Sequence, residues 1–107
     1  MGFRLESVDN RCLVRLPDAV TVNCATELHR TLVEALASAG PVEIDLENVT
    51  EVDVSAIQVL DAAARAARSD GKSFTASVTV PETISHAFRL CGLDPFAQPP
   101  MTAAENE

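Results

Sequence analysis

The chain opens with two short segments in which apolar and polar residues alternate. Residues 3–8 and residues 11–16 both show this period of two, which is typical of strands with one buried face. Asp9 and Asn10 lie between the two segments and supply a turn. The sequence therefore predicts a β-hairpin at the start of the chain.

From Asn23 onward the apolar period lengthens from two residues to about four. Leu28, Leu32 and Leu36 recur at every fourth position, which places them in one apolar stripe on a helix. Gly40 follows the last turn of this pattern and is a typical helix stop. We therefore expect the first helix to run from about Asn23 to a point shortly before Gly40.

The second half of the chain alternates between the same two periods. Residues 42–46 alternate as a strand, residues 55–69 form an Ala-rich helical pattern, and residues 74–80 alternate again. A last helical pattern begins at Pro81 and ends at Gly92. The expected order is strand, strand, helix, strand, helix, strand, helix.

This order predicts an α/β fold with a single domain. Its mixed β-sheet opens with the hairpin and continues β-α-β-α-β-α, so right-handed crossovers pair the later strands in parallel and the helices pack on the sheet. Residues 1–96 form the domain, with Leu93 and Phe96 expected to dock on the core. Residues 97–107 begin near two prolines and continue as a polar stretch, which is typical of a flexible tail.

Charge and composition exclude several classes of function. The 107 residues include 8 Lys and Arg against 16 Asp and Glu, for a formal net charge of −8. A surface of that sign repels phosphate backbones and anionic lipids, so we expect no binding to nucleic acid, no direct insertion into a membrane, and attachment to a membrane surface only through another signal. The sequence has no apolar run near the ~20 residues of a membrane span and no signal-peptide core. These features favour a cytoplasmic protein.

The cysteines and histidines give no indication of metal, redox or cofactor chemistry. Cys12, Cys24 and Cys91 lack the paired spacing of zinc or redox motifs, so we expect reduced and mostly buried thiols. His29 and His86 lie on separate predicted helices without a partner at ligand spacing, which favours surface positions. No glycine-rich phosphate loop is present. We expect no catalytic residue, no metal and no cofactor.

The best candidate site lies where the third strand leads into the second helix. Sites of parallel sheets collect beyond the carboxyl ends of the strands, where residues 17–24 and 47–56 are both expected. Ser55 is expected at or near the helix N-cap, where its side-chain oxygen accepts from free backbone amides. The same amides and the helix dipole would stabilise a phosphate on that oxygen, so the position suits reversible phosphorylation. A serine that only caps the helix is the simpler alternative.

Acidic residues near this segment have more than one interpretation. Asp45 and Asp53 could form a carboxylate pair for acid–base chemistry, but Asp45 alternates away from the apolar face, so we expect it in solvent. Glu47 and Glu51 are expected to form a solvated acidic rim. If this rim contacts a partner, the partner's surface there should be basic. An enzyme that uses Asp53 and Ser55 is the least favoured alternative, because no base lies at a recognisable spacing to activate the serine.

A longer stretch of the chain resembles a known family. Residues 42–60 (VEIDLENVTEVDVSAIQVL), the Ala-rich helix after them and the later Leu-Cys-Gly-Leu at residues 90–93 are similar to a STAS domain of the anti-sigma-factor-antagonist family. The resemblance spans nearly residues 3–96, and the family topology agrees with the expected order of elements. The usual core motif of the family is Asp, Ser, Ser or Thr, Gly, then Leu or Ile. It corresponds to Asp-Val-Ser-Ala-Ile at residues 53–57.

The resemblance implies a bacterial interaction module that switches partners and is not an enzyme. The position phosphorylated in many members corresponds to Ser55, and the acidic position of the motif corresponds to Asp53. An unphosphorylated domain of this kind binds an anti-sigma factor or a related serine kinase, and a phosphate of about −2 charge disrupts docking. By this resemblance Ser55 is the phosphoacceptor. The implied partner-binding residues are Asp53, Val54, Ser55, Ala56, Ile57 and Gln58.

Two departures from the family motif favour an alternative within the same fold. Val54 replaces a serine, and Ala56 replaces the glycine that lets a partner's backbone approach closely. Some STAS domains resemble accessory subunits of lipid ABC transporters or of chemotaxis assemblies. In these, the helix after the motif docks on a partner, such as a transporter ATPase subunit, without phosphorylation. Whether the free edge of the opening hairpin pairs with a second copy stays open.

Overall fold

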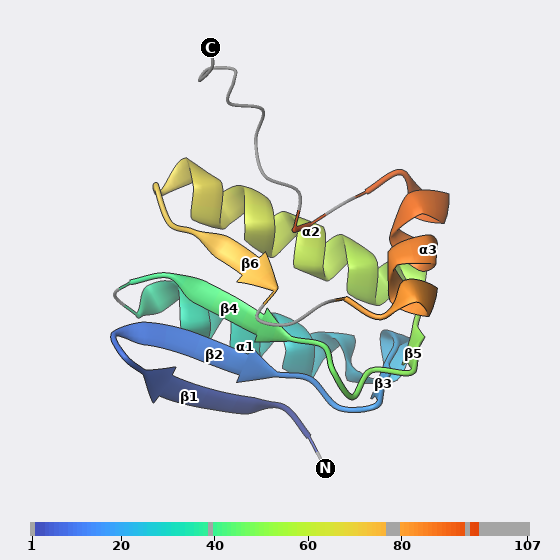
Figure 1. Ribbon diagram of the computed structural model, residues 1–107, viewed down its shortest axis with the longest axis horizontal. Helices are drawn as coiled ribbons and strands as arrows, with labels where there is room; N and C mark the ends of the chain where they lie inside the picture. Colours follow the sequence, from blue (N-terminus) through green and yellow to red (C-terminus); the bar gives the residue numbers. More distant parts are fainter. Residues whose placement is uncertain (1, 39, 77–79, 94, 97–107) are drawn as a thin grey trace.

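The computed structural model describes residues 2–38, 40–76, 80–93 and 95–96. Within these residues the chain forms a four-stranded sheet, a separate two-stranded sheet and three α-helices (Figure 1). The elements in chain order are β1 (Arg4–Val8), β2 (Arg11–Arg15), β3 (Ala19–Val20), the short 3-10 helix η1 (Val22–Cys24), α1 (Ala25–Ala37), β4 (Val42–Asp45), β5 (Glu51–Val52), α2 (Val54–Ser69), β6 (Phe74–Ala76) and α3 (Glu82–Cys91).

The main sheet has the order β1-β2-β4-β6 and is mixed. β1 pairs with β2 in the antiparallel direction, whereas β2 with β4 and β4 with β6 are parallel pairs. Asp9 and Asn10 have φ angles of 52° and 69°, the left-handed backbone that a tight two-residue hairpin turn requires. The predicted hairpin and the predicted α/β class are confirmed.

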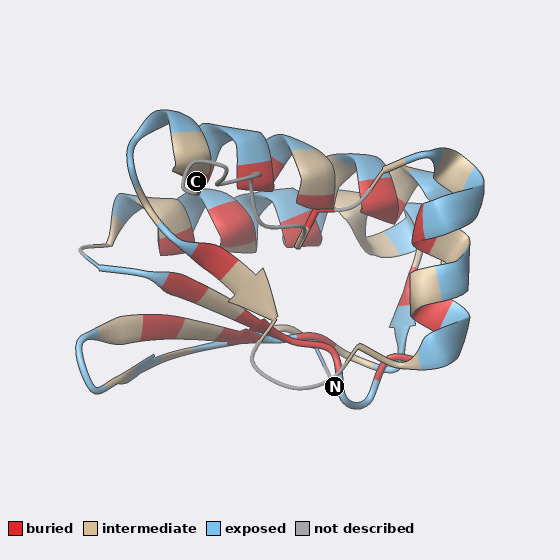
Figure 2. Ribbon diagram, turned by 45° about the horizontal axis from the view of Figure 1, so that its top comes forward, coloured by how far each residue is buried: buried red, intermediate tan, exposed pale blue. Residues whose placement is uncertain are grey.

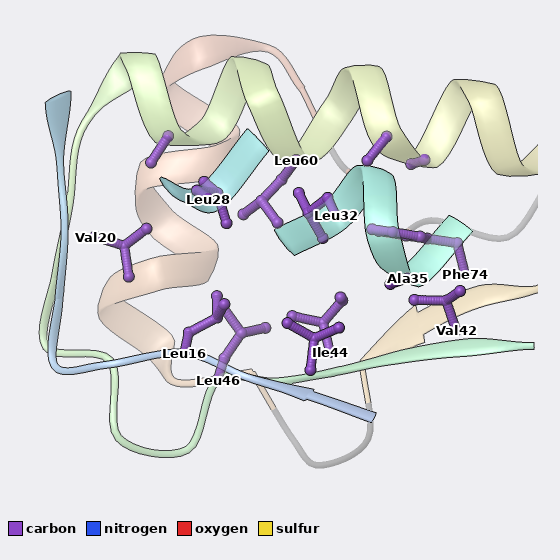
Figure 3. Close-up of a cluster of buried hydrophobic side chains, with 14 of the residues drawn as sticks. Leu16, Val20, Leu28, Leu32, Ala35, Val42, Ile44, Leu46, Leu60 and Phe74 are labelled. Carbon is purple, nitrogen blue, oxygen red and sulfur yellow. The ribbon is translucent and has the colours of Figure 1, made fainter. Parts of the chain in front are cut away.

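Helices α1 and α2 lie side by side over one face of the sheet, and their buried residues turn toward it (Figure 2). Figure 3 shows Leu28 and Leu32 of α1 and Leu60 of α2 above Ile44 and Leu46, which come from β4 and the residue after it. All five side chains are buried. Full burial of one such side chain contributes roughly 1.5–3 kcal/mol, so this layer contributes substantially to stability.

The middle of α2 is built from small residues, which lets its backbone lie close to its neighbours. Its buried positions include four alanines: Ala56, Ala63, Ala64 and Ala67. Alanine also has the highest helix propensity, so the same residues favour the helix locally. The small side chains therefore let α2 pack against α1, its main neighbour, without losing stability of its own.

The C-terminal part of the described chain closes one end of the core. The ring of Phe96 stacks on Phe74 with centroids 5.7 Å apart and lies 5.9 Å from Phe88. Leu93 also packs against the core, as expected for both residues. Gly92 ends α3 with φ at 71°, in agreement with its predicted role as a helix stop. No helix in the described part of the chain is long and apolar enough to cross a membrane.

The exposure predicted for Asp45 is wrong. Asp45 does lie on the sheet face away from the helices, as its alternation indicates, but only 9% of the residue is exposed. Its carboxylate accepts a hydrogen bond from the Glu47 N–H at 2.9 Å and lies 3.9 Å from the Arg15 guanidinium. β4 is a central strand, so side chains of neighbouring strands cover positions that alternation alone assigns to solvent.

Two short strands were not predicted. β3 and β5 pair in parallel as a separate small sheet, with Ala19 opposite Glu51 and Val20 opposite Val52. β6 confirms the start of the predicted strand 74–80, whereas residues 77–79 and the predicted tail 97–107 lie outside the described residues.

Candidate functional site

Asp53 organises the start of α2. It is the N-cap of the helix, and its side chain accepts a hydrogen bond from the N–H of Ala56 at 3.1 Å. Its other carboxylate oxygen accepts from the N–H of Val22 at 2.8 Å. A carboxylate is favourable at this position because the N-terminus of a helix carries free N–H groups and a partial positive charge. Asp53 therefore fixes both the start of α2 and its position relative to η1.

Ser55 lies in the first turn of α2, near the cap as expected, but it does not cap the helix. Asp53 occupies the N-cap, so the capping role expected of the Ser55 hydroxyl is wrong. Ser55 is half-buried, and its hydroxyl makes no hydrogen bond to any residue that the structure describes. Modification of this hydroxyl would therefore break no hydrogen bond with the described residues.

The backbone N–H groups of Val54 and of Ser55 itself also lack a hydrogen-bond partner among the described residues. The Ala56 N–H is taken by the Asp53 side chain and the Ile57 N–H by the Asp53 carbonyl. Free amides at a helix N-terminus form a favourable environment for an anion. A phosphate on Ser55 would meet this environment and, at the same time, the negative charge of Asp53.

Of the six candidate partner-binding residues, Asp53 is half-buried and caps α2, and the other five divide into two groups. Val54 is 54% exposed and Gln58 is exposed, so together with half-buried Ser55 they present side chains to the surface. Ala56 and Ile57 are 0% and 1% exposed and belong to the core. The methyl group of Ala56 therefore points inward, and the departure from glycine at this position affects packing of α2 rather than the approach of a partner.

Val22 extends the exposed part of this surface. Its side chain is 62% exposed, and its N–H binds Asp53, the residue directly before Val54. Because Asp53 binds the Val22 N–H and directly precedes Val54, the two exposed valines lie in the same region of the surface. We call Val22, Val54, Ser55 and Gln58 the switch surface. The sequence prediction included residues 17–24 as a strand-end loop but did not single out Val22.

The acidic rim lies beside the switch surface. Glu47 and Glu51 are exposed, as predicted. The carbonyl oxygen of Asp18 accepts from the N–H groups of Thr50 at 2.7 Å and Glu51 at 3.1 Å, which ties the two strand-end loops together. Asp45 has different hydrogen-bond partners from Asp53, so the structure does not join these two carboxylates into one site.

The other candidate residues are dispersed. His29 and His86 are exposed on α1 and α3, as expected. Cys12 is buried, Cys24 and Cys91 are half-buried, and all three are free thiols. In the part of the chain that the structure describes, no group of three or more His, Cys, Asp or Glu residues is arranged to hold a metal ion.

Several solved structures with the same fold are anti-sigma factor antagonists, and others are structures of a protein named Mglu, of which this fold is only a part. The anti-sigma factor antagonist SpoIIAA in its unphosphorylated form superposes with a TM-score of 0.73 at 16% identity, covering 98% of this chain and 94% of that chain. The phosphorylated form of SpoIIAA, a cell fate determinant of Bacillus, gives a TM-score of 0.69 at 15% identity, with 98% and 97% covered. The chain thus has the fold of an anti-sigma factor antagonist.

The sequence itself assigns the family. The family model described as "Mlab, STAS domain" matches residues 3–99. The chain belongs to this STAS domain family, as the motif at residues 53–57 indicates. A search of curated proteins found no significant match.

Proposed function

We propose that this protein is a non-catalytic anti-sigma-factor antagonist of the bacterial cytoplasm, and that phosphorylation of Ser55 weakens its binding to an anti-sigma factor or serine kinase. One observation carries the proposal: the Ser55 hydroxyl makes no hydrogen bond to the described residues and lies beside two unpartnered amides. The same fold in SpoIIAA, which has been solved with and without phosphate, supports it.

The chemistry of the switch surface explains why a phosphate would act against binding. In the unphosphorylated state, exposed Val22 and Val54 offer apolar area for a partner to bury. Phosphorylation of Ser55 adds about −2 charge directly after Val54 and close to Asp53. A partner would then have to desolvate a strongly hydrated group to reach the same apolar contacts, so its affinity falls.

A binding role fits the site better than an enzymatic one. A nucleophilic serine needs an adjacent base within hydrogen-bond reach to accept its proton. The Ser55 hydroxyl has no hydrogen bond to such a group in the described residues. The two histidines are exposed on other helices. We therefore assign Ser55 the role of substrate for a separate kinase.

Intact-mass spectrometry of the protein from its native cells tests the proposal. Wild type, Ser55→Ala and Ser69→Ala should be purified under conditions that preserve phosphate. Ser69 is an exposed serine at the other end of α2 and serves as the matched control. We expect a phosphate on wild type and on Ser69→Ala, and none on Ser55→Ala. A phosphate that persists on Ser55→Ala, or equal partner binding by Ser55→Ala and Ser55→Asp, would contradict the proposal.

Val54 favours a second candidate function. An exposed valine stands where the family motif has serine, and it adds apolar contact area without any phosphate. This suits a permanently docked accessory subunit of a lipid ABC transporter or a chemotaxis assembly. Co-purification with a transporter ATPase subunit, from cells in which Ser55 is unmodified under all growth conditions, would support this alternative.

A further inference from the structure

The outer edge of β1 is open. β1 is the first strand in the order β1-β2-β4-β6, so β2 is its one neighbour among the described strands (Figure 1). Val8 and Arg11 flank the two-residue turn, and such a pair exchanges both backbone hydrogen bonds. Hydrogen-bonded pairs alternate along an antiparallel ladder, so the backbone groups of Leu5 and Ser7 point away from β2.

The backbone bonds of β2 agree with this assignment. Cys12, which lies opposite Ser7, donates its N–H to the Pro41 carbonyl at 2.9 Å. Leu16 donates its N–H to the Asp45 carbonyl at 3.1 Å. The even-numbered residues of β2 and its extension therefore bond toward β4. The odd-numbered residues are left to bond β1, and the free edge of β1 consists of the groups at Leu5 and Ser7.

The side chains of β1 carry charges of both signs on one face. Arg4 and Glu6 lie on the same face and approach to 3.4 Å, with 70% and 32% of their side chains exposed. Leu5 lies on the opposite face and is 37% exposed, although it belongs to the apolar side of the hairpin. An edge strand with an exposed leucine and unpaired backbone groups is a template for pairing with another strand.

We propose that two copies of this chain pair antiparallel through β1, with Leu5 of each copy facing Leu5 of the other at a two-fold axis. In this register Arg4 of one copy lies opposite Glu6 of the other, and the reverse pair forms on the other side of the axis. Opposite charges across a strand pair stabilise it, and the two leucines bury each other. The outward backbone groups of Leu5 and Ser7 are then satisfied, and the two sheets become continuous.

The charges also disfavour the neighbouring registers. A shift of two residues in one direction places Glu6 opposite Glu6, and a shift in the other direction places Arg4 opposite Arg4. Like charges directly opposite each other destabilise a strand pair. Charges on an edge strand usually prevent pairing, but the order Arg-Leu-Glu at residues 4–6 is complementary to itself.

The pairing is independent of the proposed phosphorylation. The switch surface lies at the start of α2, beside β5 and α3, whereas β1 forms a different edge of the molecule (Figure 1). A dimer through β1 therefore leaves both switch surfaces accessible and holds them in one assembly.

Sedimentation equilibrium of complementary charge variants tests the register. Wild type should show a monomer–dimer equilibrium over a range of concentrations. Arg4→Glu and Glu6→Arg each place like charges opposite each other. Each variant alone should therefore dimerise at least about tenfold more weakly than wild type. Mixed in equal amounts, they should form a heterodimer, because the new carboxylate at position 4 faces the new guanidinium at position 6. Arg65→Glu on exposed α2 carries the same charge change and should dimerise as wild type does.

Hydrogen exchange of the wild type gives a second readout that does not depend on the folding of any variant. The amides of Leu5 and Ser7 should gain protection as the protein concentration rises, while the amides of Arg4 and Glu6 should not change. A monomer at every concentration would overturn the proposal. So would a dimer that both charge variants form as well as wild type does, or one that leaves the Leu5 and Ser7 amides unprotected.

Discussion

The carboxylate of Asp53 accepts a hydrogen bond from the backbone N–H of Val22, 31 residues earlier in the chain, at 2.8 Å. Its other oxygen accepts from Ala56 in the first turn of α2 at 3.1 Å. One side chain therefore holds together the two segments that form the switch surface. The acidic position of the family motif has a structural role in this chain before any partner binds.

Asp53→Ala should lower the free energy of unfolding by about 1–2 kcal/mol, the usual cost of losing an N-cap. Asp53→Asn keeps one acceptor oxygen and should cost less. Urea unfolding measures both changes. Asp61→Ala is the matched control, since it removes a carboxylate of the same helix that pairs with exposed Arg65 at 2.8 Å. Such a pair contributes about 0.5 kcal/mol, so equal losses at positions 53 and 61 would contradict the capping role.

Gly40 packs against the backbone of Asn10 and holds the α1–β4 connection against the hairpin turn. Its φ angle is 92°, and an added Cβ would overlap the Asn10 carbonyl oxygen. Gly71 also has a positive φ angle, 75°, but an added Cβ would meet no atom within 4 Å. Gly71→Ala should therefore cost only the strain of a left-handed backbone, about 1–2 kcal/mol.

Gly40→Ala should cost clearly more than Gly71→Ala, because it adds the clash with Asn10 to the same backbone strain. Thermal unfolding of the two variants beside wild type measures the difference. Equal unfolding temperatures for the two variants would show that the hairpin turn moves away from position 40 without cost.

The strong periodicities explain which elements the sequence predicts. The hairpin and the three helices each have several residues in phase, so local pattern and local structure agree. β3 and β5 have two residues each, too few to show a period, and they form only because they pair with each other across the chain. Asp45 shows the same limit: its alternation indicates the correct face of β4, but its burial depends on strand order and on Arg15.

The candidate site was predictable in part for a similar reason. The helix start and the neighbourhood of Ser55 follow from local pattern. Aspartate is as good an N-cap as serine, so the sequence could also have predicted Asp53 as the N-cap, with its side chain bound to the N–H of Ala56 three residues later. The position of Val22 beside this site could not be predicted from local pattern, because it depends on a hydrogen bond to a residue far along the chain.

Asp45→Ala should destabilise the protein by about 1–3 kcal/mol, because it removes a charged acceptor that binds a backbone N–H in a nearly buried position. Glu47→Ala is a suitable control in the same turn. It removes the same charge from an exposed side chain but keeps the N–H that Asp45 binds. The control should stay within about 0.5 kcal/mol of wild type in urea unfolding. A similar loss in both variants would mean that net charge, and not the buried acceptor, determines the effect.

Exposed valines allow the switch surface to be tested separately from folding. Val22, Val54 and Val33 are 62%, 54% and 52% exposed, but Val33 lies in the middle of α1 and outside the switch surface. Val22→Asp and Val54→Asp should each reduce partner capture by about tenfold or more, because they place a hydrated charge where the partner buries apolar area. Val33→Asp should capture the partner as wild type does, and all three variants should fold.

Quantitative pull-down from native-cell lysate, with each variant carrying an unmodified Ser55, measures how much partner is captured. A captured protein counts as the partner only if it binds wild type but not Ser55→Asp. Loss of such a protein with Val22→Asp as well as Val54→Asp would extend the contact from the helix motif to η1. If Val22→Asp binds normally while Val54→Asp does not, the partner contacts α2 alone. If neither substitution weakens binding, or if Val33→Asp weakens it equally, the partner docks elsewhere and the switch surface is wrong.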